Sequence, residues 1–171
     1  MKIAEFARAI PTYRKRGVLV DTNLLLLYFT GLVDAHAIAN FKPLRSHAFT
    51  PADYELLLRF LNQFDRIVTT PHILAEVSNH SDKLKGRAHD ELVRAIAFAA
   101  AELTEEFRPA KTICELEEFR KFGLTDAAIT AIAARNYLVL TIDFPLAGHL
   151  ESRGIDVINF NHLRPISFED I

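Results

Sequence analysis

The stretch that decides the fold is Gly17-Val-Leu-Val-Asp-Thr-Asn-Leu-Leu-Leu-Leu-Tyr28. Its first part, Val18–Val20, is short, aliphatic and β-branched, which predicts a buried strand. The strand stops at a single acid, Asp21, and an apolar helix is predicted over about residues 24–29, ending near Gly31. Open α/β sheets bind their ligands at the carboxyl ends of parallel strands. Asp21 is therefore the first candidate functional residue.

Strand and helix patterns alternate along the rest of the chain. Further strands are predicted at 66–69, 137–142 and 155–158, and helices at about 51–63, 71–80, 88–107, 125–134 and 145–153. Thr50, Thr70 and Thr125 are placed as helix N-caps. We predict an α/β fold with a central, mainly parallel β-sheet flanked by α-helices, in a single domain 1–171.

Two segments lie outside this alternation. Residues 1–16 are predicted to be an N-terminal extension, with an amphipathic helix that Pro11 ends. Residues 32–65 are predicted to be an enlarged helical insert, irregular in its first half.

Composition limits the classes of partner. The 171 residues carry a net charge of −2, so no global positive field draws the chain to nucleic acid. Local basic patches are the candidate RNA contacts, with solvated turns as the alternative: Arg14, Lys15, Arg16, Lys83, Lys85 and Arg87. A single cysteine, Cys114, cannot form an internal disulfide, which favours a reducing, cytoplasmic setting. No apolar run of about 18 residues predicts a membrane span.

Three more acids lie beside apolar segments. Asp143 follows the strand at 137–142, and Thr141 lies two residues earlier on the same face of that strand. Asp126 opens a helix, where an acid also interacts favourably with the helix dipole. Glu76 lies in the middle of a helix, where a solvated Glu is common. On spacing alone, the structural interpretation of Asp126 is favoured over the functional one, and Glu76 would not be singled out.

Four carboxylates gathered at one sheet edge would repel one another unless a cation binds between them. Ligands that are all oxygen favour Mg²⁺ or Mn²⁺ over zinc. Such an ion activates a water and clamps a phosphate during hydrolysis. A zinc site on the helix face of His72, Glu76 and His80 is the alternative, although the strand-end carboxylates do not suit it.

From Val18 to about Pro165 the chain resembles the PIN-domain family of metal-dependent ribonucleases. The matching segments are Val-Leu-Val-Asp21-Thr-Asn-Leu-Leu, Thr70-Pro-His-Ile-Leu-Ala-Glu76-Val, Gly123-Leu-Thr-Asp126-Ala-Ala-Ile and Leu-Thr141-Ile-Asp143-Phe-Pro-Leu. The resemblance implies a PIN-like fold and an endoribonuclease that uses a metal-activated water on RNA. It also implies that the four acids bind the metal and carry catalysis, with Asn23 and Thr141 as polar groups beside them.

Partners and other functions stay open. Many PIN domains are toxins of toxin–antitoxin pairs, so an antitoxin protein is a candidate partner, although compact PIN toxins lack a segment like 32–65. A homodimer through the apolar face of helix 88–107 is the alternative to burial of that face in the core. The other functions are a non-catalytic RNA- or protein-binding PIN scaffold, and a metal-dependent phosphohydrolase. The phosphohydrolase resembling the haloacid-dehalogenase superfamily would require a second acid where Asn23 stands.

Overall fold

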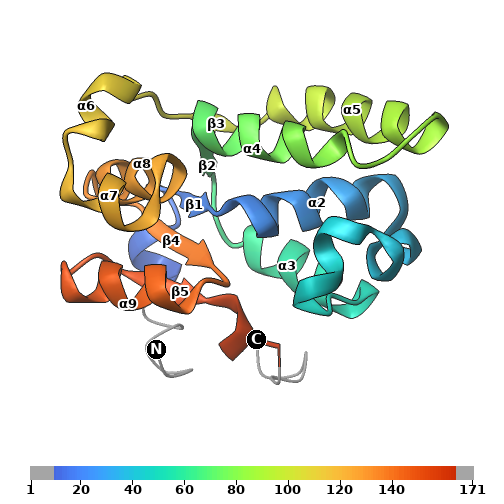
Figure 1. Ribbon diagram of the computed structural model, residues 1–171. Coiled ribbons are helices and arrows are strands. Elements are labelled where there is room, and N and C mark those ends of the chain that lie inside the picture. The colour runs from blue at the N-terminus through green and yellow to red at the C-terminus, as the bar shows by residue number, and fades with distance from the viewer. Residues whose placement is uncertain (1–9, 165–171) are drawn as a thin grey trace.

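A five-stranded, all-parallel sheet forms the centre of the protein (Figure 1). We describe residues 10–164 of a computed structural model. The strands are β1 (Val18–Val20), β2 (Ile67–Thr69), β3 (Thr104–Glu105), β4 (Leu138–Thr141) and β5 (Val157–Asn159). The predicted α/β fold with a parallel sheet flanked by helices is confirmed.

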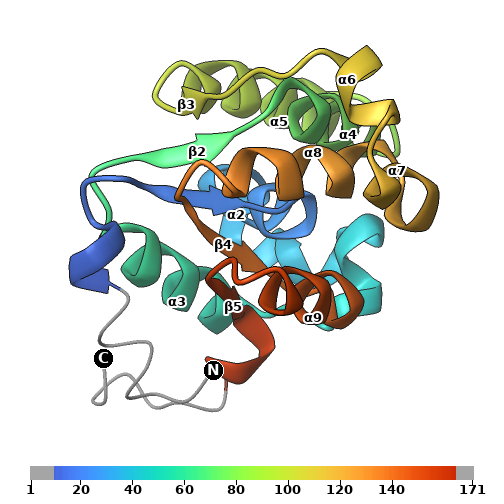
Figure 2. The same ribbon diagram turned by 90° about the vertical axis from the view of Figure 1, so that its left-hand side faces the viewer.

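Helices and turns fill the connections between the strands. The α-helices are α2 (Thr22–Asp34), α3 (Pro51–Leu61), α4 (Pro71–Ser81), α5 (Arg87–Ala100), α6 (Ala110–Cys114), α7 (Glu117–Phe122), α8 (Leu124–Ala133) and α9 (Phe144–Ser152). Three 3₁₀ helices are η1 (Ala35–Asn40), η2 (Lys42–His47) and η3 (Phe160–His162). Both ribbon views place β3 at one edge of the sheet and α9 beside β5 at the other (Figure 1, Figure 2).

The strand order β3-β2-β1-β4-β5 is that of a doubly wound sheet. The chain builds outward from β1 to β3, and then returns to the other side of β1 to add β4 and β5. β1 therefore pairs with both β2 and β4, and Val20 lies opposite Leu140. The carboxyl ends of β1 and β4 therefore form the topological switch point, which is where such sheets bind ligands.

Helix α2 is longer than predicted, and the reason lies in Gly31. A Cβ at Gly31 would collide with the ring of Tyr54 on α3, so this glycine permits close helix packing and does not end the helix. Residues Leu24–Leu27 are fully buried. By length and composition the segment Thr22–Asn40 could cross a membrane, but half of its apolar window is buried inside the protein, as in a core helix.

Three other predictions about where helices begin or end were wrong. The predicted helix 88–107 is α5 followed by the edge strand β3, whose two residues are too few to show alternation. Thr50 and Thr70 are N-caps as predicted, but α8 is capped by Gly123 and not by Thr125. Residues 10–13 are helical, so Pro11 does not end the helix; the rest of that predicted helix lies outside the described residues.

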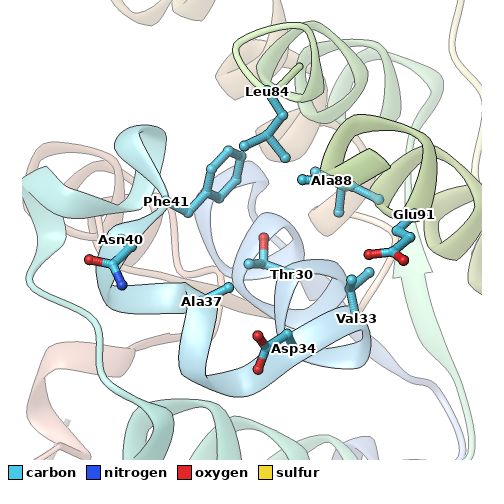
Figure 3. Close-up of a pocket in the computed structure, with 10 residues that line it drawn as sticks. Thr30, Val33, Asp34, Ala37, Asn40, Phe41, Leu84, Ala88 and Glu91 are labelled. Carbon is cyan, nitrogen blue, oxygen red and sulfur yellow. The ribbon is translucent and has the colours of Figure 1, made fainter. Parts of the chain in front are cut away.

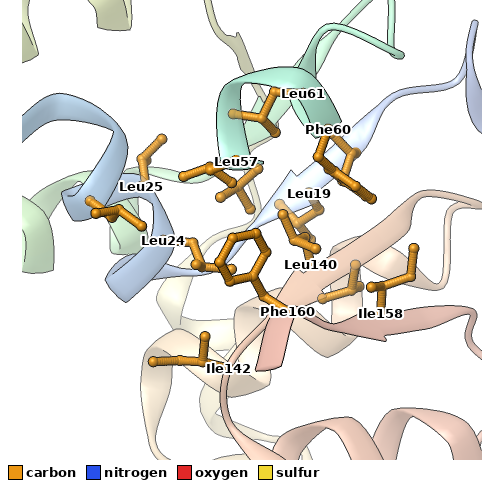
Figure 4. Close-up of a cluster of buried hydrophobic side chains, with 14 of the residues drawn as sticks. Leu19, Leu24, Leu25, Leu57, Phe60, Leu61, Leu140, Ile142, Ile158 and Phe160 are labelled. Atoms are coloured by element: carbon orange, nitrogen blue, oxygen red, sulfur yellow. The ribbon is translucent and has the colours of Figure 1, made fainter. Parts of the chain in front are cut away.

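A hydrophobic cluster joins the sheet to α2, α3 and the segment after β5 (Figure 4). Leu57 and Phe60 of α3 pack there with Leu140 of β4 and Phe160 of η3. The segment 32–65 is helical, as predicted, and contributes to this cluster through η1, η2 and α3. The cluster packs the sheet against α2, α3 and η3.

Candidate functional site

Asp21 lies at the carboxyl end of β1 and is 5% exposed. One carboxylate oxygen accepts a hydrogen bond from the backbone N–H of Thr22 at 2.6 Å, which makes Asp21 the N-cap of α2. The other accepts a hydrogen bond from the hydroxyl of Thr141 at 2.6 Å. Both oxygens are therefore held in place by the end of the neighbouring strand and the start of the helix.

Thr141 also connects Asp21 to Asp143. Its hydroxyl accepts a hydrogen bond from the backbone N–H of Asp143 at 3.0 Å while it donates to Asp21. Asp143 is exposed and caps α9, since its Oδ1 accepts from the N–H of Leu146 at 2.8 Å. The two acids thus follow adjacent strands. The hydroxyl of Thr141 connects the carboxylate of Asp21 to the backbone of Asp143.

Glu76 reaches this edge from α4. The hydroxyl of Thr22 donates to its Oε2 at 3.0 Å, and Thr22 itself is 3% exposed. Sequence reasoning missed the role of Thr22, because its partner lies 54 residues away in the chain. The only local signal was its position directly after Asp21.

Asp126 is partly buried in the first turn of α8, which contacts α4 and β4. The pKa of Asp126 is raised to about 7; burial is the largest cause, followed by the charges of Asp21, Asp143 and Glu76 in that order. The four predicted acids are therefore close enough to repel one another. We call this group of four the acid cluster.

The pKa of Asp21 is also raised, to about 6. Burial is the largest cause, and the charges of Glu76 and Asp143 act in the same direction. The hydrogen bonds from Thr141 and Thr22 oppose the rise. No Lys or Arg is among the groups that shift the pKa of Asp21 or Asp126 in the described part of the chain.

The donor set fits a hard divalent cation, because it consists of carboxylates, and the charges that raise the pKa values of Asp21 and Asp126 are those of other carboxylates. As they stand, the side chains of residues 10–164 contain no group of three or more His, Cys, Asp or Glu close enough to hold a metal ion. The carboxylates of the acid cluster would therefore have to move closer together on binding. The same finding gives no support to the zinc site at His72, Glu76 and His80.

A row of polar residues crosses the carboxyl edge of the sheet. Thr141 lies opposite Asn159, the last residue of β5, and Asn159 is 5% exposed. Its Oδ1 accepts from the N–H of Asn161, while its Nδ2 is buried without a hydrogen-bond partner. Sequence reasoning missed Asn159. The predicted neighbour Asn23 is the second residue of α2 and is partly buried, and within residues 10–164 its side chain forms no hydrogen bond with the four acids.

The two predicted basic patches lie in different parts of the fold. Residues 14–16 precede β1, at the opposite end of that strand from Asp21. Arg14 pairs with Asp65 at 3.4 Å, and Arg16 lies over the ring of Tyr13. The second patch lies between α4 and α5, where Lys83 contacts His80 and Arg87 pairs with Glu91 at 2.7 Å; Lys85 is exposed beside them.

A pocket of about 230 Å³ lies apart from the acid cluster, between α2, η1 and α5 (Figure 3). Its walls are mostly apolar, with Phe41 and Leu84 on one side and Val33 on the other. None of the four acids lines it. The chemistry of the acid cluster therefore belongs to the sheet edge and not to this pocket.

No protein-family model matches the sequence, and comparisons with curated proteins and with solved structures found no match either. The resemblance to PIN domains therefore stays a prediction.

Proposed function

We propose that this chain is a divalent-metal-dependent endoribonuclease with a PIN-like fold, which hydrolyses RNA phosphodiesters at the acid cluster. The observation that carries the proposal is the surroundings of Asp126. Burial and then the charges of three other carboxylates raise its pKa, and no cation among the described residues opposes them. Such a cluster is unfavourable by itself and becomes favourable when a divalent cation binds.

Asp21, Glu76, Asp126 and Asp143 would hold Mg²⁺ or Mn²⁺. The bound ion supplies positive charge that lowers the pKa of a water and offsets the charge of a phosphodiester. Thr141 and Thr22 hold Asp21 and Glu76 by hydrogen bonds of 2.6 and 3.0 Å. Hydroxyls that fix ligand carboxylates in this way reduce the reorganisation that metal binding requires.

Hydrolysis by water fits the site better than attack by a side chain. Thr22 and Thr141 are the hydroxyls in contact with the acids, and they are 3% and 0% exposed. A buried hydroxyl cannot reach the phosphorus of a substrate. Asp143 is the exposed member of the cluster, so we assign it the position nearest to the scissile phosphate.

The test is cleavage of end-labelled unpaired and hairpin RNAs with Mn²⁺, by the parent chain and by Asp143→Asn. Asparagine is a good N-cap, so the variant should keep α9 folded. We expect cleavage to fall more than about 100-fold, since loss of a supporting group alone costs 10- to 100-fold. RNA binding should persist or tighten, because a negative charge is lost.

Three outcomes separate the candidate functions. Cleavage that persists in chelator would contradict metal dependence. RNA binding by the parent without cleavage in Mn²⁺ would favour the non-catalytic scaffold. Release of phosphate from a monoester, with RNA left intact, would favour the phosphohydrolase. With a net charge of −2, RNA affinity should depend only weakly on salt.

A further inference from the structure

An exposed aromatic ring lies directly beside the acid cluster. Phe144, the residue after Asp143, begins α9 and is 59% exposed. Removing a ring of this size from water is favourable. An exposed Phe that borders a candidate site is therefore a candidate contact for a ligand. Consecutive Cα atoms are about 3.8 Å apart, so the backbone that carries this ring directly adjoins Asp143.

A second ring lies against the first. The rings of Phe144 and His162 have centroids 5.7 Å apart and are tilted by 58°. His162 is also exposed, and it comes from η3, which follows β5. Two chain segments therefore present aromatic rings at the same place, next to the exposed acid of the cluster.

The position of His162 is fixed by the end of the sheet. The side-chain amide of Asn161 donates to the backbone carbonyl of Ile142 at 3.1 Å, and the side chain of Asn159 accepts from the N–H of Asn161 at 3.0 Å. Phe160 is fully buried in the core. These contacts hold the backbone of η3 against the end of β4, and so bring His162 to the side of Phe144.

We propose that Phe144 and His162 form a stacking platform for one unpaired nucleobase, next to the phosphate held at the acid cluster. A base stacks on an aromatic ring only when it is free of its own helical stack, so single-stranded RNA or an unpaired loop is the substrate class. The imidazole of His162 adds a hydrogen-bonding group for a base edge. This inference rests on the proposed function and deepens it.

Binding without cleavage tests the platform. In an Asp126→Asn background, affinity for a labelled unpaired oligonucleotide and for a hairpin stem is measured by fluorescence anisotropy. Adding Phe144→Leu should weaken binding of the unpaired RNA about tenfold, within the range for loss of one stacked base, and leave stem binding unchanged. Phe144→Tyr keeps the ring and should restore affinity.

Phe98 offers the matched control. It is 80% exposed on α5, which lies at the β3 side of the molecule, away from α9 (Figure 1). Phe98→Leu removes an exposed ring of the same kind and should leave RNA binding unchanged. A 2-aminopurine base in the unpaired RNA should be quenched on binding to the background protein and not to its Phe144→Leu form.

The outcomes distinguish the platform from the proposed function. If the background protein binds unpaired RNA and Phe144→Leu binds it equally well, the platform is wrong while the nuclease proposal stands. Equal weakening by Phe144→Leu and Phe98→Leu would also overturn the platform. If the parent neither binds nor cleaves any RNA, the proposed function itself fails.

Discussion

Two acid-containing regions of this protein have opposite surroundings. Asp53 on α3 is 7% exposed, about as buried as Asp21. Its two carboxylate oxygens accept hydrogen bonds from Arg164 at 2.9 and 3.1 Å. Asp53 also forms a capping box with Thr50, whose N–H donates to it at 2.7 Å. In the described part of the chain, the hydrogen bonds to this carboxylate come from Thr50 and Arg164, which are donors.

The acid cluster lacks this compensation. Asp21 receives two hydrogen bonds, but its charged neighbours are Glu76 and Asp143. No hydrogen-bond donor among the described residues lowers the pKa of Asp126. Glu118 follows the pattern of Asp53, because its own backbone N–H, His149 and Arg153 lower its pKa. Asp53 and Glu118 thus have compensating donors and cations, whereas Asp21 and Asp126 face other acids, and the proposed metal site rests on this difference.

The largest expected effect separates the two regions by activity. Asp126→Asn should reduce Mn²⁺-dependent RNA cleavage more than about 100-fold, because it removes a metal-binding oxygen. Asp53→Asn should leave cleavage per folded molecule unchanged. The measurement is single-turnover cleavage, normalised to the folded fraction. Equal losses in the two variants would mean that the acid cluster has no special role.

The second-largest expected effect is a difference in stability between a substitution at Asp53 and one in the acid cluster. Asp53→Asn should lower the free energy of unfolding by about 3 kcal/mol, because it leaves Arg164 partly buried opposite an amide. Asp126→Asn should stabilise the metal-free protein, since it removes a repelled charge. Urea unfolding in chelator measures both changes. Destabilisation by both substitutions would contradict the contrast.

A smaller effect is expected from pH in the metal-free protein. The pKa values of Asp21 and Asp126 are raised to about 6 and about 7, so the folded state binds these protons more tightly than the unfolded chain does. Their stabilising contribution is complete below pH 3.8, the ordinary pKa, and is lost as pH rises through 6 and 7. The cluster's contribution should therefore fall by roughly 2 kcal/mol between pH 5 and 8, a value reduced for screening at partly exposed Asp126.

The control for this pH effect is Asp126→Asn, which should flatten the dependence. His47 and His80 have lowered pKa values and act in the opposite direction, so the difference between parent and variant is the informative quantity. Mn²⁺ should increase stability most at high pH, where the acids are ionised. Parallel pH curves for parent and variant would show that Asp126 titrates normally.

The sequence predicted the parts of this site that depend on strand position. Asp21 and Asp143 follow buried strands, and parallel pairing of β1 with β4 brings both to one edge. Spacing alone did not distinguish Asp126 from an ordinary first-turn acid, or Glu76 from a solvated one. Only the resemblance selected them, because their shared surroundings depend on how α4 and α8 pack.

Long-range contacts explain what the sequence did not predict. Arg164 pairs with Asp53 across 111 residues, and no local pattern indicates such a partner. The sequence predicts a helix end near Gly31, whereas in the structure the missing side chain of Gly31 leaves room for the ring of Tyr54. Strand β3 has two residues and is recognised only by its pairing with β2. Packing, rather than periodicity, decides all three.

The smallest effect tests whether Thr141 tunes the acid cluster. Thr141→Val removes the hydroxyl that donates to Asp21 and accepts from the N–H of Asp143. Mn²⁺ affinity, measured by calorimetry, should fall about tenfold, and its pH dependence should move upward because this hydrogen bond lowers the pKa of Asp21. Thr130→Val is the matched control, since that buried hydroxyl donates to the backbone carbonyl of Asp126 and not to a carboxylate. Both variants should lose about 1 kcal/mol of stability, but only Thr141→Val should weaken metal binding; equal Mn²⁺ affinities would refute the assigned role of Thr141.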